Sequence, residues 1–163
     1  EKIGVEGWSL GDSISGLSAM AGRRLALSLS AVVPVPGGGL RGAELPEHLD
    51  RIAWVMTQEA YRQGIPAGSD WRFGLAANDT PVNAPLELVY GMEPPCREFF
   101  RLLGMRDLRD QAVCCAKAAG RMLALASGGD IPYIEPVIAK PLAMSAMTET
   151  YRSVCLENAI VSC

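Results

Sequence analysis

The sequence predicts an α+β fold in which a small antiparallel sheet is covered by about four helices. Residues 24–33 alternate in hydrophobicity with the two-residue period of a strand, and two shorter alternating runs lie at 71–77 and 86–90. Most of the remaining chain shows the period of amphipathic helices. This grouping of strands and helices favours an antiparallel sheet covered mainly on one face, with an all-α bundle as the alternative.

The first 22 residues contain five glycines, a density that disfavours a stable helix interior. A short helix that begins at Asp12 or Ser13 still fits, since both residues are good N-caps. From Arg24 onward, leucines at every second position favour a half-buried strand over residues 24–33. A helix from Ser13 to Val33 is the alternative interpretation of the same residues.

A helix is predicted between Leu45 and Gly64. Its apolar side chains fall on one stripe, Pro46 suits the first turn, and Gly64 supplies the stop. The two short strands at 71–77 and 86–90 follow, joined by a loop of turn-forming residues.

Three helices are predicted in the second half of the chain. The first opens at Pro94 and is closed by Gly104, the second has Asp107 as N-cap, and the third is capped by Ser145. Residues 128–144, which precede the third helix, are spaced by three prolines that break a helix and suit extended chain.

The length and composition describe one globular domain over residues 1–163. With 49% hydrophobic and 20% charged residues, the chain is not intrinsically disordered as a whole. A net charge of −3 argues against a general nucleic-acid binder. The longest apolar run, Leu25–Val35, is far shorter than the ~20 residues of a membrane-spanning helix.

The single histidine, His48, restricts the chemistry that one chain can perform. It excludes a multi-histidine metal site, and a serine or cysteine nucleophile with a histidine base would have to use His48. The sequence pattern places His48 in the first turn of a helix, where a partly exposed surface residue is the simpler interpretation. No C-x-x-C pair and no phosphate-binding loop is present, so we expect no metal site and no cofactor.

Cys96 is the cysteine with the best case for catalysis. It is predicted in the first turn of a helix, where the helix dipole and the neighbouring Arg97 lower the pKa of a thiol. Glu93 and Glu98 oppose a thiolate at the same position. An ordinary core cysteine is the alternative interpretation.

Three of the other cysteines lie on predicted helices. Cys114 and Cys115 are adjacent and form a candidate redox pair. Cys115 and Cys155 face inward, where they are either small core residues or the two ends of a disulfide between the last two helices. Reduced core cysteines fit the cytoplasm, the compartment we expect, whereas export would apply if Glu1 is a processed N-terminus.

The strongest sequence signal for partner contacts lies in residues 128–144. Apolar side chains on extended chain must be covered by the same domain or by a partner. We therefore expect a non-catalytic binding or assembly subunit that contacts other protein subunits or a second copy of itself. The candidate interface residues are Trp8, Tyr133, Ile134, Val137, Ile138 and Leu142.

Two alternative functions are compatible with the sequence. One is a thiol-dependent enzyme or redox sensor that uses Cys96, or Cys114 and Cys115. The other is a small-molecule carrier with an apolar pocket. Its candidate lining residues are Met56, Trp71, Phe73 and Met122.

Overall fold

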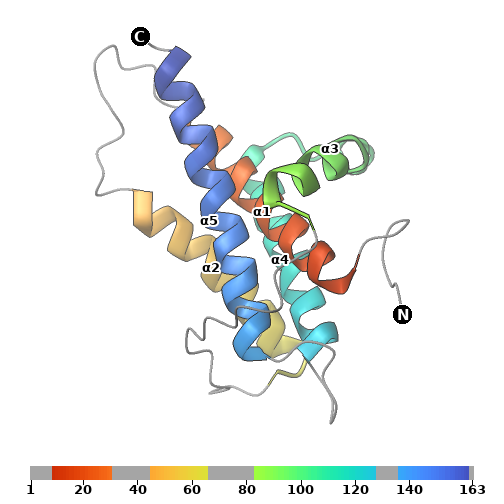
Figure 1. Ribbon diagram of the computed structural model, residues 1–163. Coiled ribbons are helices and arrows are strands. Elements are labelled where there is room, and N and C mark those ends of the chain that lie inside the picture. The colour runs from red at the N-terminus through yellow and green to blue at the C-terminus, as the bar shows by residue number, and fades with distance from the viewer. Residues whose placement is uncertain (1–8, 31–44, 66–82, 128–135, 162–163) are drawn as a thin grey trace.

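The computed structural model describes residues 9–30, 45–65, 83–127 and 136–161. These residues form five α-helices and no strand. Figure 1 shows α1 passing between α4 and α5, with α3 packed on α1 and α2 packed on α4. The helices are α1 (Leu10–Ser30), α2 (Leu45–Arg62), α3 (Pro85–Leu102), α4 (Leu108–Ser127) and α5 (Pro136–Val161).

The predicted antiparallel sheet is wrong, and the all-α alternative fits the described residues. Residues 24–30 of the first predicted strand belong to α1, and the predicted strand at 86–90 belongs to α3. Residues 31–33 and the predicted strand at 71–77 lie outside the described part of the chain.

The alternation that suggested a strand arises because α1 is buried on almost all sides. Leu25, Ala26 and Leu29 are buried together with the polar residues Arg24 and Ser28. A helix enclosed by its neighbours has no single apolar stripe, so its period is hidden in the sequence. Ser28 tolerates burial because its hydroxyl donates to the carbonyl oxygen of Leu25 at 2.7 Å.

A capping box fixes the start of α1. The hydroxyl oxygen of Ser9 accepts from the Asp12 amide at 3.0 Å, while the Ser9 amide and hydroxyl donate to Asp12 Oδ2 at 3.1 and 2.8 Å. The Asn83 amide donates to Asp12 Oδ1 at 3.3 Å, which joins the start of α1 to the start of α3. Because Ser9 is the N-cap, the helix begins at Leu10, before the predicted position.

Gly22 explains why a glycine-rich segment forms a long helix. A Cβ at Gly22 would overlap the main-chain carbonyl oxygen of Met147 on α5. Beside this crossing, the Thr150 hydroxyl donates to the carbonyl oxygen of Ala19 at 2.9 Å. The cost of a helical glycine, about 1 kcal/mol, is offset by this close packing. The expectation that the glycines disfavour a stable helix interior is therefore wrong for the described residues 10–22.

The predicted helices that begin near Leu45 and Asp107 are confirmed as α2 and α4. Gly64 ends α2 with a φ of 109°, as expected for a glycine stop. The Asp107 side chain accepts from the amides of Arg109 and Asp110 at 2.7 and 3.1 Å, as expected for an N-cap.

The helices α2 and α4 cross at Gly120, where a Cβ would overlap the carbonyl oxygen of Met56. Next to the crossing, the buried carboxylate of Glu59 accepts from Arg121 Nε at 3.0 Å and from Gln63 Nε2 at 3.0 Å. The hydrogen bond from Arg121 is the main cause that lowers the pKa of Glu59. This ion pair therefore ties the two helices together while the carboxylate is ionised.

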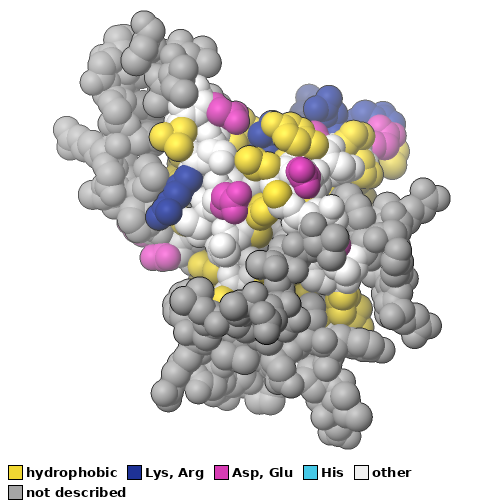
Figure 2. Space-filling view, viewed as in Figure 1, with side chains coloured by type: hydrophobic (Ala, Val, Ile, Leu, Met, Phe, Trp, Pro, Cys, Tyr) yellow, Lys and Arg dark blue, Asp and Glu magenta, His cyan; other side chains and the backbone are white. Residues whose placement is uncertain are grey.

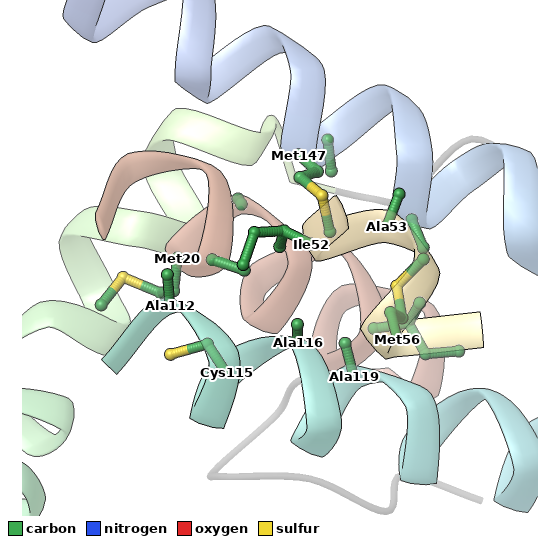
Figure 3. Close-up of a cluster of buried hydrophobic side chains, with 14 of the residues drawn as sticks. Met20, Ile52, Ala53, Met56, Ala112, Cys115, Ala116, Ala119 and Met147 are labelled. Atoms are coloured by element: carbon green, nitrogen blue, oxygen red, sulfur yellow. The ribbon is translucent and has the colours of Figure 1, made fainter. Parts of the chain in front are cut away.

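The core is built from alanine and methionine more than from aromatic side chains. Figure 3 shows these side chains converging from α1, α2, α4 and α5. Alanines let the helix axes approach closely, and the flexible methionine side chains fill the irregular space that remains. The labelled residues are Met20, Ile52, Ala53, Met56, Ala112, Cys115, Ala116, Ala119 and Met147.

The predicted start of α3 was wrong because its prolines were interpreted as a helix boundary. The helix begins at Pro85, with proline in the first turn, and not at Pro94. Pro94 and Pro95 both lie inside the helix, where each removes one main-chain donor. Gly104 closes the helix as predicted, with a φ of 65° and a hydrogen bond from the Met105 amide to the Phe100 carbonyl oxygen.

The helix α5 begins at Pro136 and not at Ser145, so the predicted extended segment is wrong for residues 136–144. Residues 128–135 lie outside the described part of the chain. Pro136 suits the first position of a helix. Pro141 has no main-chain amide hydrogen, so one carbonyl oxygen in the preceding turn of α5 lacks its helical hydrogen bond. Small buried side chains on this helix, at Ala139, Ala143 and Ala146, allow close packing on α1.

Candidate functional site

The most extensive group of exposed apolar side chains among the described residues lies on α3. Phe99, Leu102 and Leu103 are 51%, 70% and 57% exposed. Figure 2 shows hydrophobic side chains beside charged ones over α3. Water-exposed apolar side chains gathered in one place are typical of interaction surfaces.

The exposed apolar residues of α3 follow a helical repeat. Since each residue turns a helix by 100°, positions 91, 95, 99 and 102 fall within an arc of about 80°. Gly91 and Pro95 are exposed, like Phe99 and Leu102. We call the following residues the outer face of α3: Gly91, Pro95, Phe99 and Leu102, together with the adjoining C-cap residue Leu103.

The helix α3 is held against α1 by its buried residues Leu88, Val89 and Phe100. Leu88 falls inside the arc of the outer face, so that face is exposed only from Gly91 onward. Arg24 of α1 donates to Glu93 at 2.7 Å, and its guanidinium carbon lies 5.8 Å from the centre of the Phe100 ring. The helix α3 is therefore anchored by apolar contacts, by an ion pair and by a cation–π contact.

Phe99 is positioned through its neighbour Phe100. The two rings lie edge to face, with centroids 5.7 Å apart and an interplanar angle of 64°. Phe100 is buried and lies under Arg24, so the exposed Phe99 ring packs against an anchored neighbour.

Charged groups surround the outer face. Glu98 accepts from Arg101 Nε and a terminal guanidinium nitrogen at 2.8 and 2.6 Å, and both side chains are exposed. This pair lowers the pKa of Glu98. On the side toward α1, Glu93 lies 3.8 Å from Arg23 and 3.5 Å from Arg97, in addition to its bond with Arg24. The outer face is therefore flanked by charges of both signs.

The structure brings three of the predicted thiol candidates into one region. The neighbouring charges that act on Cys96 include Arg24, Glu93 and Cys114, and those that act on Cys115 include Cys96 and Cys114. Burial is the main cause that raises the pKa of both Cys96 and Cys115. Both thiols are therefore protonated at neutral pH, and Cys96 lies in the fourth turn of α3, away from the helix start that would activate it.

The candidate disulfide partners carry free thiols in the structure. Cys115 is buried and Cys155 is half-buried. Burial raises the pKa of Cys155, and it raises the pKa of the adjacent Tyr151 to about 12. The crosslink between Cys115 and Cys155 stays a prediction.

His48 lies in the first turn of α2, as predicted, and is half-buried. His48 is not among the groups that shift the pKa of Cys96, Cys115 or Cys155. Among the described residues, no group of three or more metal-ligating side chains is placed to hold a metal ion.

A groove with a volume of about 310 Å³ lies between α2 and α5. The Trp54 side chain borders it and is 62% exposed, and burial lowers the pKa of Lys140 at the other wall. The predicted pocket residue Met56 is instead fully buried in the core, and Trp71 and Phe73 lie outside the described residues. The groove is lined by Asp50, Ala53, Trp54, Thr57, Lys140, Pro141 and Met144.

The predicted interface residues do not form one described surface. Trp8, Tyr133 and Ile134 lie outside the described residues. Positions 137 and 138 belong to the first turn of α5, and only their main chain is described. Leu142 is half-buried on the same helix.

Sequence reasoning missed the outer face of α3, although a signal for it was present. Phe99 and Phe100 are adjacent, and adjacent helical side chains point about 100° apart. On a helix that packs along one side only, such a pair favours one buried and one exposed ring, although the adjacent Leu88 and Val89 of the same helix are both buried.

Comparisons with known proteins identify no relative. No family model, no curated protein and no solved structure matches the chain. None of the helices in the described part of the chain combines the length and the hydropathy that a membrane-spanning segment needs.

Proposed function

We propose that this protein is a non-catalytic binding or assembly subunit that acts through protein–protein contacts made by the outer face of α3. The observation that carries the proposal is the exposure of Phe99, Leu102 and Leu103 on a helix that is itself firmly anchored. Interface cores are enriched in aromatic side chains, and apolar side chains exposed together mark interaction sites.

The energy available from these side chains sets the expected strength of the contact. Full burial of a leucine or phenylalanine contributes about 1.5–3 kcal/mol, and these three are half to two-thirds exposed. Covering them contributes roughly 3–5 kcal/mol before the cost of association is subtracted. The contact is therefore either weak or continued by residues beyond these three.

Site-specific photo-crosslinking tests the proposal. A benzophenone amino acid replaces Phe99 in one variant and Tyr90 in a matched control, since Tyr90 is also exposed but points to the other side of α3. We expect a discrete crosslinked product from position 99 in the producing cells, and a much weaker one from position 90. Equal products from both positions, or none from position 99, would contradict the proposal.

A second candidate function, carriage of a small molecule, is supported by the groove between α2 and α5. Its volume of about 310 Å³ is at the lower end of the range for ligand pockets, and Trp54 offers a large apolar wall. The test is the fluorescence of anilinonaphthalene sulfonate with Trp54→Ala and, as control, Phe99→Ala. Loss of dye binding only in Trp54→Ala supports the groove, whereas equal binding by all three proteins contradicts it.

The thiol-dependent alternative gains no comparable support. Burial keeps the thiols of Cys96 and Cys115 protonated, which is the unreactive form. We therefore do not favour it over the contact function.

A further inference from the structure

We propose that the groove between α2 and α5 binds a small zwitterion, a short apolar chain with an ammonium group at one end and a carboxylate at the other. This inference rests on the second candidate function, carriage of a small molecule, and names the class of ligand. The features that carry it are an apolar middle, one charge of each sign, and the placement of these charges at opposite ends.

The middle of the groove is apolar. The exposed side chain of Trp54 forms the wall of α2 together with Ala53, and Pro141 and Met144 belong to the wall of α5. A chain of a few carbon atoms therefore finds apolar surface on both sides. The volume of about 310 Å³ admits only a small ligand, since pockets for larger ones reach about 1,000 Å³.

The two charged residues of the groove lie toward its opposite ends. Figure 1 shows α2 and α5 running in broadly opposite directions, so Thr57, the last groove residue of α2, lies toward Lys140, the first of α5. Asp50 precedes Thr57 by about 10 Å along the axis of α2. Helical side chains lean toward the N-terminus of their helix, so those of Asp50 and Lys140 lean apart. A ligand that meets both groups therefore needs its own charges at the two ends of a chain.

The negative end of the groove offers a carboxylate beside an aromatic ring. Asp50 and Trp54 are four residues apart, so they are neighbours on one face of α2. The adjacent Arg51 pairs with Glu47 at 2.8 Å, and no described residue forms an ion pair or a hydrogen bond with the Asp50 side chain. An ammonium group at this end meets the carboxylate of Asp50 and the neighbouring indole ring, both of which attract cations.

The positive end of the groove is supplied by Lys140. The nearby Thr57 hydroxyl already donates to the carbonyl oxygen of Ala53 at 2.9 Å, so the donor for a ligand at this end is Lys140. An ammonium group has three hydrogen-bond donors, so it can bind a carboxylate in addition to its contacts within the chain. Burial lowers the pKa of Lys140, because its ammonium group has lost part of its hydration. A ligand carboxylate offsets that loss.

The two charges together select against ligands that carry only one. A fatty acid of the same length pairs with Lys140 and covers Asp50 with an uncharged end, and an alkylamine does the reverse. A charged group that is covered without being paired opposes binding. The groove therefore favours the zwitterion over either analogue.

A ligand-observed NMR titration with ω-aminohexanoic acid tests this assignment. We expect the wild-type chain to bind it with a Kd on the order of millimolar values, since the ligand has few atoms. Hexanoic acid and hexylamine, which each lack one charged group, should bind at least about fivefold more weakly. No binding of ω-aminohexanoic acid, or equal binding of either analogue, would overturn the zwitterion.

Two variants test which residue meets which end of the ligand. Asp50→Asn should weaken the binding of ω-aminohexanoic acid about threefold or more without weakening that of hexanoic acid. Lys140→Gln should weaken the zwitterion to a similar extent without weakening hexylamine. Circular dichroism checks that both variants are folded, and Asp50→Asn changes an exposed side chain, so it tests the site even if Lys140→Gln unfolds.

The control is Glu47→Gln, which removes an exposed carboxylate of α2 that does not line the groove. We expect it to leave the Kd unchanged. If Glu47→Gln weakens binding as much as Asp50→Asn does, or if Asp50→Asn has no effect, the assignment of the ammonium end to Asp50 is overturned.

The titration also separates this inference from the carrier function on which it rests. If anilinonaphthalene sulfonate binding depends on Trp54 while ω-aminohexanoic acid does not bind, the groove still takes a small apolar ligand and the zwitterion is excluded. If neither compound binds, both fail.

Discussion

Arg24 on α1 donates to Glu93 on α3 at 2.7 Å, and both side chains are largely shielded from water. Arg24 also lies over the buried ring of Phe100, whose neighbour Phe99 belongs to the outer face. This contact joins the central helix of the bundle to the helix that carries the candidate interaction surface. The orientation of that surface therefore depends on the ion pair.

Glu93→Gln should lower the free energy of unfolding by about 2–4 kcal/mol, because it leaves the shielded guanidinium of Arg24 without its counter-charge. Urea denaturation measures the change. The matched control is Glu47→Gln, which removes an exposed pair with Arg51 and should cost less than about 1 kcal/mol. Equal losses from the two variants would show that the Arg24–Glu93 pair is not effectively buried.

Gly22→Ala should destabilise the protein by about 2 kcal/mol or more, although alanine is the better helix former. The new Cβ overlaps a main-chain carbonyl oxygen of Met147, which cannot move without shifting α5. Gly16→Ala is the control, because its Cβ would overlap only the flexible Met92 side chain, while Leu88 Cβ lies at an ordinary contact distance of 3.5 Å. Thermal unfolding of the two variants should differ clearly, and similar melting temperatures would contradict the close approach of α1 and α5.

Helix ends with local chemical signals were predictable from the sequence. The glycine stops at Gly64 and Gly104 and the N-cap Asp107 depend on residues within one turn, so no knowledge of the remaining fold was needed.

The elements that were wrongly predicted depend on distant contacts. The strand-like pattern after Arg24 is explained only by the helices that enclose α1. Pro94 and Pro141 look like helix boundaries in the sequence, yet α3 and α5 continue through them, because packing on α1 outweighs the lost hydrogen bonds. The candidate surface was missed for the same reason, since the start and direction of α3 decide which side Phe99 faces.

The stability of the protein should fall as the pH is lowered through the titration of Glu59. Its pKa in the folded protein is lowered below the ordinary value of 4.5, chiefly by Arg121. A lowered carboxyl pKa contributes stability that is complete above the unfolded value and is lost as the pH falls through the folded value. Denaturant titrations between pH 6 and pH 2 should show this loss. Glu59→Gln and Arg121→Gln should each make this loss of stability at low pH smaller. If stability still depends on pH as in the wild type in both variants, the role of the Glu59–Arg121 ion pair is refuted.

Alkylation should modify Cys115 more slowly than any other described cysteine. Cys115 is buried and its pKa is raised, so both access and thiolate formation are suppressed. Iodoacetamide labelling at pH 8, followed by peptide mass spectrometry, measures each site. Labelling in urea provides the control, because unfolding should equalise the rates. Rapid and selective labelling of Cys96 in the native protein would instead favour the thiol-dependent alternative.

Photo-crosslinking in the producing cells tests the central claim, protein contacts through the outer face of α3, most directly. A benzophenone amino acid at Leu102 should give a discrete crosslinked product, whose mass shows whether the partner is a second 17.4 kDa chain or a different protein. The same amino acid at Trp54, an exposed apolar position of α2, should give a much weaker product. Equal products from the two positions, or no product from position 102, would contradict the account.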